Sequence, residues 1–167
     1  MGSTLTVDNI VGATSASNIH IPGHVIQVVQ GVDNTQSNTN NSTDTEALSG
    51  LRTSITPKST SSKILVTLSY HVVTTAGASH AAVFVKRSTD GGSSFVNLSN
   101  YLQGTGNEIH RNALTVGYFG QHTQVILDSP ATTSTCIYNI FVRTNGSNIR
   151  LNDNGAGTRI ILQEIAQ

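Results

Sequence analysis

The sequence predicts an all-β protein, built as a single antiparallel sandwich or barrel. Three observations support this. Apolar and polar residues alternate with a period of two in several short segments, no stretch has a helical period of useful length, and turn residues recur at intervals of about 8–12 residues. The chain has 167 residues, which suits one domain. Short strands at regular spacing are typical of β-sandwiches.

The first half of the predicted domain contains its clearest strands. His24–Gln30 is a β-branched run that predicts the first strand, and Lys63–Val73 alternates most regularly. Ala81–Lys86 and Phe95–Leu98 lie on either side of Thr89–Gly92, which predicts a hairpin. Further strands are expected at 112–119, 123–127, 135–143, 148–151 and 158–165, with Asn145-Gly146 as a hairpin signal between two of them.

Two segments are expected to lie outside this strand pattern. Residues 1–23 have too few large apolar side chains for a core of their own, although Thr4–Val11 could pair as a short strand. We therefore predict an extended N-terminal docking arm at 1–23 and a sandwich domain at 24–167. Gly31–Asp44, dense in Asn, Ser, Thr and Gln, is predicted to be a long exposed loop.

The composition excludes several classes of function. Charged residues make up 11% of the chain, against roughly 25% in ordinary soluble domains, and the 9 basic residues balance the 9 acidic ones. No basic field exists to hold nucleic acid, and no polybasic or long apolar run predicts membrane binding or insertion. No apolar signal segment follows Met1, so synthesis in a cytoplasm is expected. The single cysteine, Cys136, predicts a buried thiol and no disulfide within the chain.

No motif predicts catalysis, a cofactor or a metal. The six histidines are scattered, and Pro22-Gly23 separates His20 from His24, although one His on a threefold axis could still become three ligands. Asn152–Gly155 lacks the spacing of a calcium loop and is expected to be a turn, as is Gly155-Ala156-Gly157. We expect no enzymatic activity, because no nucleophile or carboxylate pair has a supporting motif.

One motif is more specific. Ser88-Thr-Asp90-Gly-Gly92-Ser-Ser-Phe95 matches the Asp-box pattern of Ser-x-Asp-x-Gly-x-x-aromatic. In that motif an Asp caps the backbone N–H groups of a hairpin turn and an aromatic ring packs beneath it. Sialidase-like propellers repeat the motif once per blade, whereas this chain has one copy and is too short for a propeller. The motif therefore supports the hairpin and not glycan cleavage.

Several segments resemble structural proteins of marine tailed phages, including cyanophages. They are Ser3–Thr14, Ser17–Val29, Ile55–Lys58, Ser62–Thr67, Leu127–Pro130 and Ile161–Gln167, so the resemblance covers most of the chain apart from the loops near 31–44 and 104–108. In those proteins the domain often ends a longer tail fibre. The strand number and the apolar last strand also look like trimeric jelly rolls of the tumour-necrosis-factor type.

The resemblance implies a virion structural protein, assembled in the host cytoplasm: a short trimeric fibre, a knob or a capsid decoration protein. Its arm would dock on a capsid or tail protein, and we name Leu5, Val7, Ile10 and Val11 as docking residues. Ile160, Ile161 and Leu162 are apolar on both faces of the last strand, which predicts a trimer interface there. The alternative is a receptor- or glycan-binding tip domain that uses loops 35–44 and 104–110, with a host surface glycan as partner.

Overall fold

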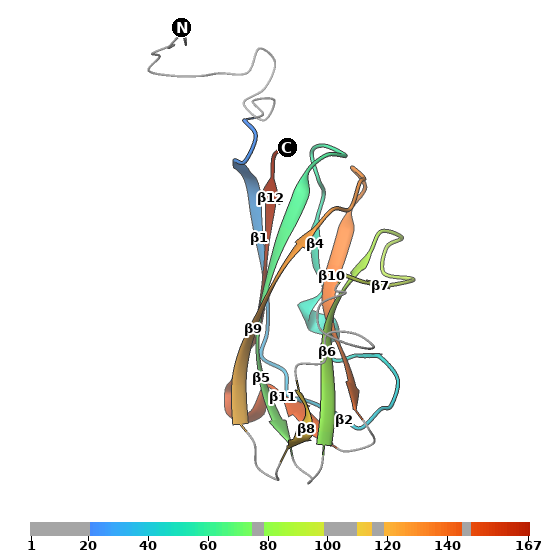
Figure 1. The fold of residues 1–167 in the computed structure, drawn as a ribbon, viewed down its shortest axis with the longest axis vertical. Helices are drawn as coiled ribbons and strands as arrows, with labels where there is room; N and C mark the ends of the chain where they lie inside the picture. The colour runs from blue at the N-terminus through green and yellow to red at the C-terminus, as the bar shows by residue number, and fades with distance from the viewer. Residues whose placement is uncertain (1–20, 75–78, 99–109, 115–118, 145–147) are drawn as a thin grey trace, which may run out of the picture.

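The structure, a computed structural model, describes residues 21–74, 79–98, 110–114, 119–144 and 148–167. Two antiparallel sheets lie face to face in this part of the chain, as the ribbon in Figure 1 shows. The first sheet contains β1 (Val25–Asp33), β2 (Ser37–Thr39), β5 (Lys63–Thr74), β9 (Phe119–Asp128), β11 (Ile149–Leu151) and β12 (Thr158–Ile165). The second contains β3 (Thr45–Glu46), β4 (Thr53–Ile55), β6 (Ser79–Ser88), β7 (Val96–Asn97), β8 (His110–Leu114) and β10 (Cys136–Thr144).

The strand order is that of a jelly roll. In the first sheet β5 pairs with β9 on one side and with β12 and then β11 on the other, and β1 pairs with β12. In the second sheet β10 pairs with β3, β4 and β6, and β6 pairs with β7 and β8. We count β3 and β4 as one interrupted strand and β7 and β8 as another, and leave the short β2 and β11 aside. The order is then β1–β12–β5–β9 in the first sheet and β3/β4–β10–β6–β7/β8 in the second. Two interleaved Greek keys of this order define the jelly roll, which confirms the predicted fold class.

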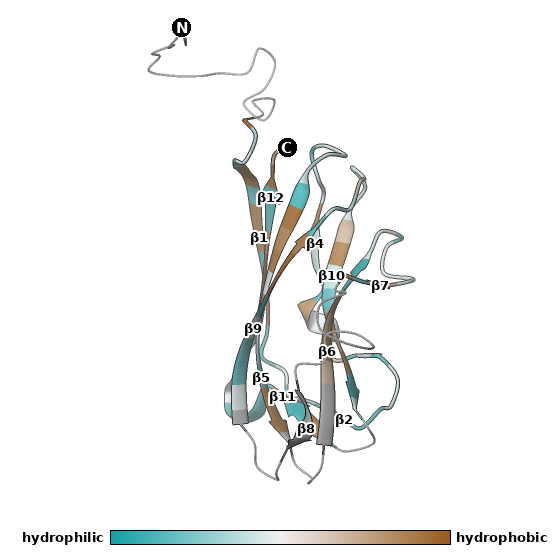
Figure 2. Ribbon diagram, in the orientation of Figure 1, coloured by the Kyte–Doolittle hydropathy of each residue, from teal (hydrophilic) through white to brown (hydrophobic). Residues whose placement is uncertain are grey.

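The core lies between the two layers because both sheets place alternate residues inward. Ile64, Val66 and Leu68 of β5 are buried, and they pack with buried Ile140 and Val142 of β10. The same period of two turns the residues between them to the outer side of each sheet, where those of β5 are half-buried and Asn139 and Phe141 of β10 are buried. Figure 2 shows the resulting hydrophobic bands along the strands and hydrophilic stretches in the connections.

Several predicted strands are confirmed. β5, β6, β10 and β12 lie where the alternation placed them, and β1 begins one residue later than expected. The predicted hairpin also forms, because β7 pairs with β6 across the turn at 89–92. At the predicted boundary of the arm, the Gly23 N–H donates to the carbonyl oxygen of Ala166, so the ladder between the first and last strands starts there.

Three expectations about connections were wrong. The predicted loop 31–44 contains the end of β1 and all of β2, which joins the sheet through backbone hydrogen bonds to β11 and needs no apolar side chains. The predicted strand 112–119 is two elements, since β8 ends at Leu114 and β9 begins at Phe119. Asn145-Gly146 lies outside the described residues, but the strands before and after it, β10 and β11, belong to different sheets and do not form the expected hairpin.

Two short 3₁₀ helices complete the described fold, η2 (Ser49–Leu51) and η3 (Asp153–Gly155). The second confirms a turn at 152–155. Asn152 has a φ of 56°, a left-handed conformation that Asn tolerates better than most residues. Its buried amide donates to the carbonyl oxygens of Asp33 and Thr35 at 2.8 and 3.1 Å. Asn152 therefore ties the turn to the end of β1.

Candidate assembly surface

The Asp-box turn is built as the sequence predicts, and its role is structural. The Asp90 carboxylate accepts the N–H groups of Ser93 and Ser94 at 3.1 and 3.0 Å, and the hydroxyl of Ser88 at 2.6 Å. Hydrogen bonds from Ser88 first, and then from Ser94, hold the pKa of Asp90 far below its ordinary value. An ionised carboxylate that is saturated by its own loop closes the turn, and it has no free oxygen poised for proton transfer.

The aromatic residue of the motif anchors this turn to the second sheet. The Phe95 ring packs on Phe141 with centroids 5.0 Å apart, and the Arg52 guanidinium lies 5.2 Å from the Phe95 centroid. Arg52 in turn donates to both oxygens of Glu46 at 2.6 and 2.8 Å. These polar and aromatic groups contact one another, so their presence is explained without a ligand.

A second polar cluster joins the two layers. Arg87 of β6 donates to both carboxylate oxygens of Asp128 on β9, at 2.7 and 2.6 Å, and the Tyr138 hydroxyl of β10 donates to the same carboxylate at 2.8 Å. Burial first, and then the neighbouring Asp128 charge, raise the pKa of Tyr138 far above its ordinary value. Such a phenol stays protonated and holds the sheets together, and it cannot act as a base.

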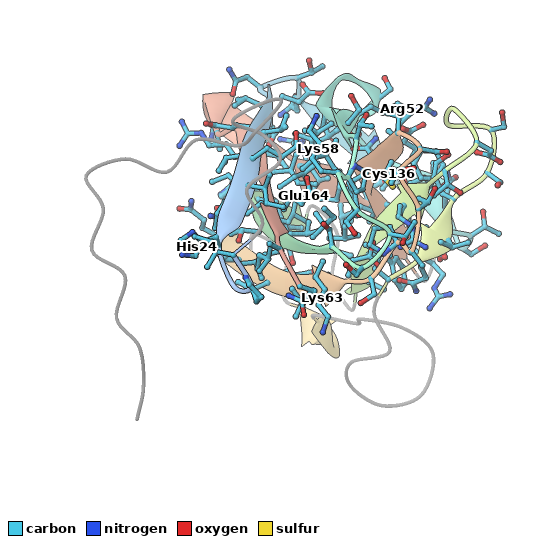
Figure 3. All side chains as sticks on the ribbon, turned by 90° about the horizontal axis from the view of Figure 1, so that it is seen from above. His24, Arg52, Lys58, Lys63, Cys136 and Glu164 are labelled. Atoms are coloured by element: carbon cyan, nitrogen blue, oxygen red, sulfur yellow. The ribbon has the colours of Figure 1, made fainter. Side chains whose placement is uncertain are left out.

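The buried carboxylate of Glu164 likewise has a structural role, because it accepts hydrogen bonds from its own chain. The Gln27 side-chain amide donates to one carboxylate oxygen at 2.5 Å, and the backbone N–H of Lys58 donates to the other at 2.6 Å. Figure 3 looks along the long axis from the end where β1 begins and the C-terminus lies. It shows Glu164 inside the sandwich, whereas His24 and Lys63 lie at its margin. The carboxylate fixes the loop before β5 to the last strand.

Among the described residues, no group of three or more His, Cys, Asp or Glu side chains could hold a metal ion. His122 lies beside Tyr70 with ring centroids 5.6 Å apart, and burial first, then His71, lower its pKa. Cys136 is fully buried, as predicted, and burial raises the pKa of its thiol. A shared histidine site on a symmetry axis stays a prediction. In the described part of the chain, no helix is long and apolar enough to cross a membrane.

The remaining distinctive feature is the outer face of the first sheet. We define it as the residues of β1, β12, β5 and β9 that point away from the core. The strand registers align them in rows across the sheet. From the end near the termini these rows are Val25–Ile165–Lys63, Val28–Gln163–Leu65–Leu127, Gln30–Ile161–Thr67–Val125 and Val32–Arg159–Ser69–Thr123.

This face carries most of the exposed large apolar side chains in the described chain. The most exposed are Val125 at 62%, Val28 at 59% and Leu127 at 53%, and Val25 and Val32 accompany them. Elsewhere in the described residues only Ile21 and Val96 belong to this class. Scattered exposed apolar residues are normal, but their concentration on one sheet face indicates a contact surface.

The structure corrects the predicted trimer interface. Ile160 and Leu162 are fully buried in the core between the layers, so they cannot contact another subunit. Only Ile161 points outward, in the row with Gln30, Thr67 and Val125. Residues 160–162 are apolar on both sides of the strand because the core side and the outer face are both apolar there.

Most of the other predicted site residues lie outside the part of the chain that the structure describes. The docking residues Leu5, Val7, Ile10 and Val11 fall outside the described residues, as does most of the candidate loop 104–110. The candidate loop 35–44 is described, and it includes β2. The structure does not bring this loop into the outer face, because β2 pairs with β11 at the far end of the sheet.

Comparison with known proteins identifies no family. No family model and no curated protein matches the chain. Solved structures that resemble it include the VP2 protein of infectious bursal disease virus in derived T=1 particles, with a TM-score of 0.46 and 10% identity, and a structure of the Gx strain of that virus, with a TM-score of 0.42 and 10% identity. Each alignment covers 100% of this chain, but the chain spans only 41% and 42% of those chains.

Proposed function

We propose that this chain is a structural protein of a virus particle, and that it works by packing against other protein surfaces. The observation that carries the proposal is the apolar outer face of the first sheet of this jelly-roll sandwich, together with carboxylates that are hydrogen-bonded within the fold. Asp90, Asp128 and Glu164 illustrate the second point, because each carboxylate is saturated by partners from its own chain. The described part of the chain therefore offers contact area, and these carboxylates have structural roles in it.

The sequence resemblance narrows the proposal to a tailed phage. The chain would form a short homotrimeric fibre, a knob or a capsid decoration protein, with residues 1–23 docking on a capsid or tail protein. A receptor- or glycan-binding tip is the weaker alternative. Its described candidate loop, 35–44, consists of polar residues and offers no aromatic ring to stack on a sugar.

Particle association tests the proposal. Phage particles from infected host cells would be banded on a density gradient and probed with antibodies against the recombinant chain. We expect the chain in the particle band, and we expect recombinant protein lacking residues 1–20 to fold but not to bind particles that lack the chain. Detection only in the unbound fraction would contradict a virion role, and normal binding of the truncated protein would contradict docking through the arm.

A further inference from the structure

We propose that the outer face of the first sheet is where copies of this chain pack against one another, and that this packing gathers their N-terminal segments at one end of the assembly. The inference deepens the proposed function and rests on it only for the use of the assembly in a particle. The face itself is defined by this structure alone.

The apolar side chains on this face are graded along the strands. The rows nearest the termini contain Val25 with Ile165, and Val28 with Leu65 and Leu127. In the next row the large apolar residues are Ile161 and Val125, and in the last row Val32 alone. The strongest driving force for association therefore lies at the end where β1 begins and β12 ends, because burial of apolar area is what stabilises such contacts.

The size of the face fits a protein–protein interface. Four strands spaced about 4.8 Å apart span about 19 Å, and the stretch of β5 from Lys63 to Ser69, along which the four rows lie, is about 23 Å long at about 3.3 Å per residue. The flat footprint is therefore about 440 Å² on that spacing. Side-chain relief increases the accessible area toward the roughly 800 Å² that each partner contributes to a stable complex.

The neutral centre of the face suits a second copy better than a strongly charged partner. Lys63 and Arg159 are the only charged side chains in the four rows, both are positive, and they lie in the first and last rows. Between them the polar positions are neutral, such as Gln30, Gln163 and Thr67. Two identical faces can meet without burying a charge at their centre, which is the pattern of an interface core with a polar rim.

Packing through this end has a consequence for docking. The first described residues, from Ile21 onward, lead into β1 beside the most apolar rows, and Figure 1 shows the start of β1 and the C-terminus at this end. Copies joined here would present their N-terminal segments from neighbouring points. Clustered docking segments bind a shared partner more tightly than single ones, because the second attachment becomes intramolecular.

A pair of matched substitutions tests the interface. Val125→Asp places a charge in the face, whereas Val96→Asp places the same charge on β7 of the other sheet, at a valine that is 53% exposed. Val28→Asp, on the opposite edge strand of the face, is the second test variant. All three side chains are solvent-exposed in a single chain, so each variant keeps its fold, and circular dichroism verifies this.

The readout is the mass of the full-length protein by analytical ultracentrifugation over a range of concentrations. We expect the unmodified chain and Val96→Asp to form the same oligomer. The dissociation constant of the oligomer should be at least about 100-fold higher for the Val125→Asp and Val28→Asp proteins, because each variant would bury an unpaired charge in the interface. A monomeric unmodified chain, or folded face variants that assemble like Val96→Asp, would overturn the inference.

Particle binding by the same variants separates this inference from the proposed function. Face-dependent oligomers that never associate with particles would leave the interface standing and remove the virion role. A folded, monomeric Val125→Asp protein that binds particles as tightly as the unmodified chain would leave the virion role and remove the claim that assembly gathers the docking segments.

Discussion

Replacing Asp128 by alanine should remove the main polar link between the two sheets. Asp128 belongs to the first sheet, whereas Arg87 and Tyr138, which both donate to it, belong to the second. The substitution leaves the Arg87 guanidinium without its counter-charge in a site where the Arg87 and Asp128 side chains are 16% and 9% exposed. Loss of one partner from a buried ion pair costs about 3–5 kcal/mol.

We expect a value near the lower end, about 3 kcal/mol, because the partly exposed guanidinium can recover some hydration. For a chain of this length each kcal/mol lowers the melting temperature by about 2–4 °C, so the predicted decrease is about 6–12 °C. Urea unfolding followed by circular dichroism measures the free energy directly, at one fixed protein concentration so that self-association contributes equally.

Asp44→Ala is the matched control. Asp44 also pairs with two cations, Lys86 at 2.6 Å and Arg143 at 3.4 Å, but its side chain is 27% exposed on the outer side of the second sheet. Solvent screens such a pair, and we expect a loss of about 1 kcal/mol or less. If Asp128→Ala costs no more than Asp44→Ala, the idea that this cluster ties the layers together is refuted.

Two further outcomes follow from the described geometry. Gly31→Ala should destabilise the fold by about 1–3 kcal/mol, because the new Cβ would collide with Thr53 Oγ1, and Thr53→Ala in the same chain should recover part of the loss in urea unfolding. Burial lowers the pKa of His122 below its ordinary 6.5, so the unfolded chain binds this proton more readily. The urea midpoint should therefore fall as pH drops below about 6.5, less steeply in His122→Gln, and an identical pH slope in the two proteins would contradict the assignment.

Much of the fold could be predicted because the longest strands combine alternation with a buried inner face. β5 shows this best, as its inward residues Ile64, Val66 and Leu68 are apolar and its ladders with β12 and β9 are long. The Asp-box turn could also be predicted, because its hydrogen bonds are local and each partner lies within a few residues of Asp90.

The elements that were missed depend on partners far away in the sequence. β2 contains only Ser37, Asn38 and Thr39 and becomes a strand because β11 supplies backbone partners more than a hundred residues later. Asn145-Gly146 carries a hairpin signal, but the flanking β10 and β11 are each recruited by a different sheet. Local residue preferences cannot encode such pairings.

The candidate surface was only partly visible in the sequence for the same reason. Ile161 was singled out, but its neighbours Val125 and Leu127 on β9, and Val28 on β1, join it only through the registers with β5 and β12. The available signal was the apolar run Val125-Ile126-Leu127. Such a run predicts a strand that is apolar on both sides, but it cannot show that four strands place their apolar outer sides together.

The most direct test of the account is the solvent accessibility of the outer face in the assembled protein. Val125→Cys and Val96→Cys each introduce one thiol at a position that is exposed in the single chain, and Cys136 is fully buried and does not compete. The account predicts that a maleimide labels the Val96→Cys protein quickly at every concentration, and that labelling of the Val125→Cys protein slows as the protein is concentrated. Equal and concentration-independent labelling at the two positions would contradict assembly through this face.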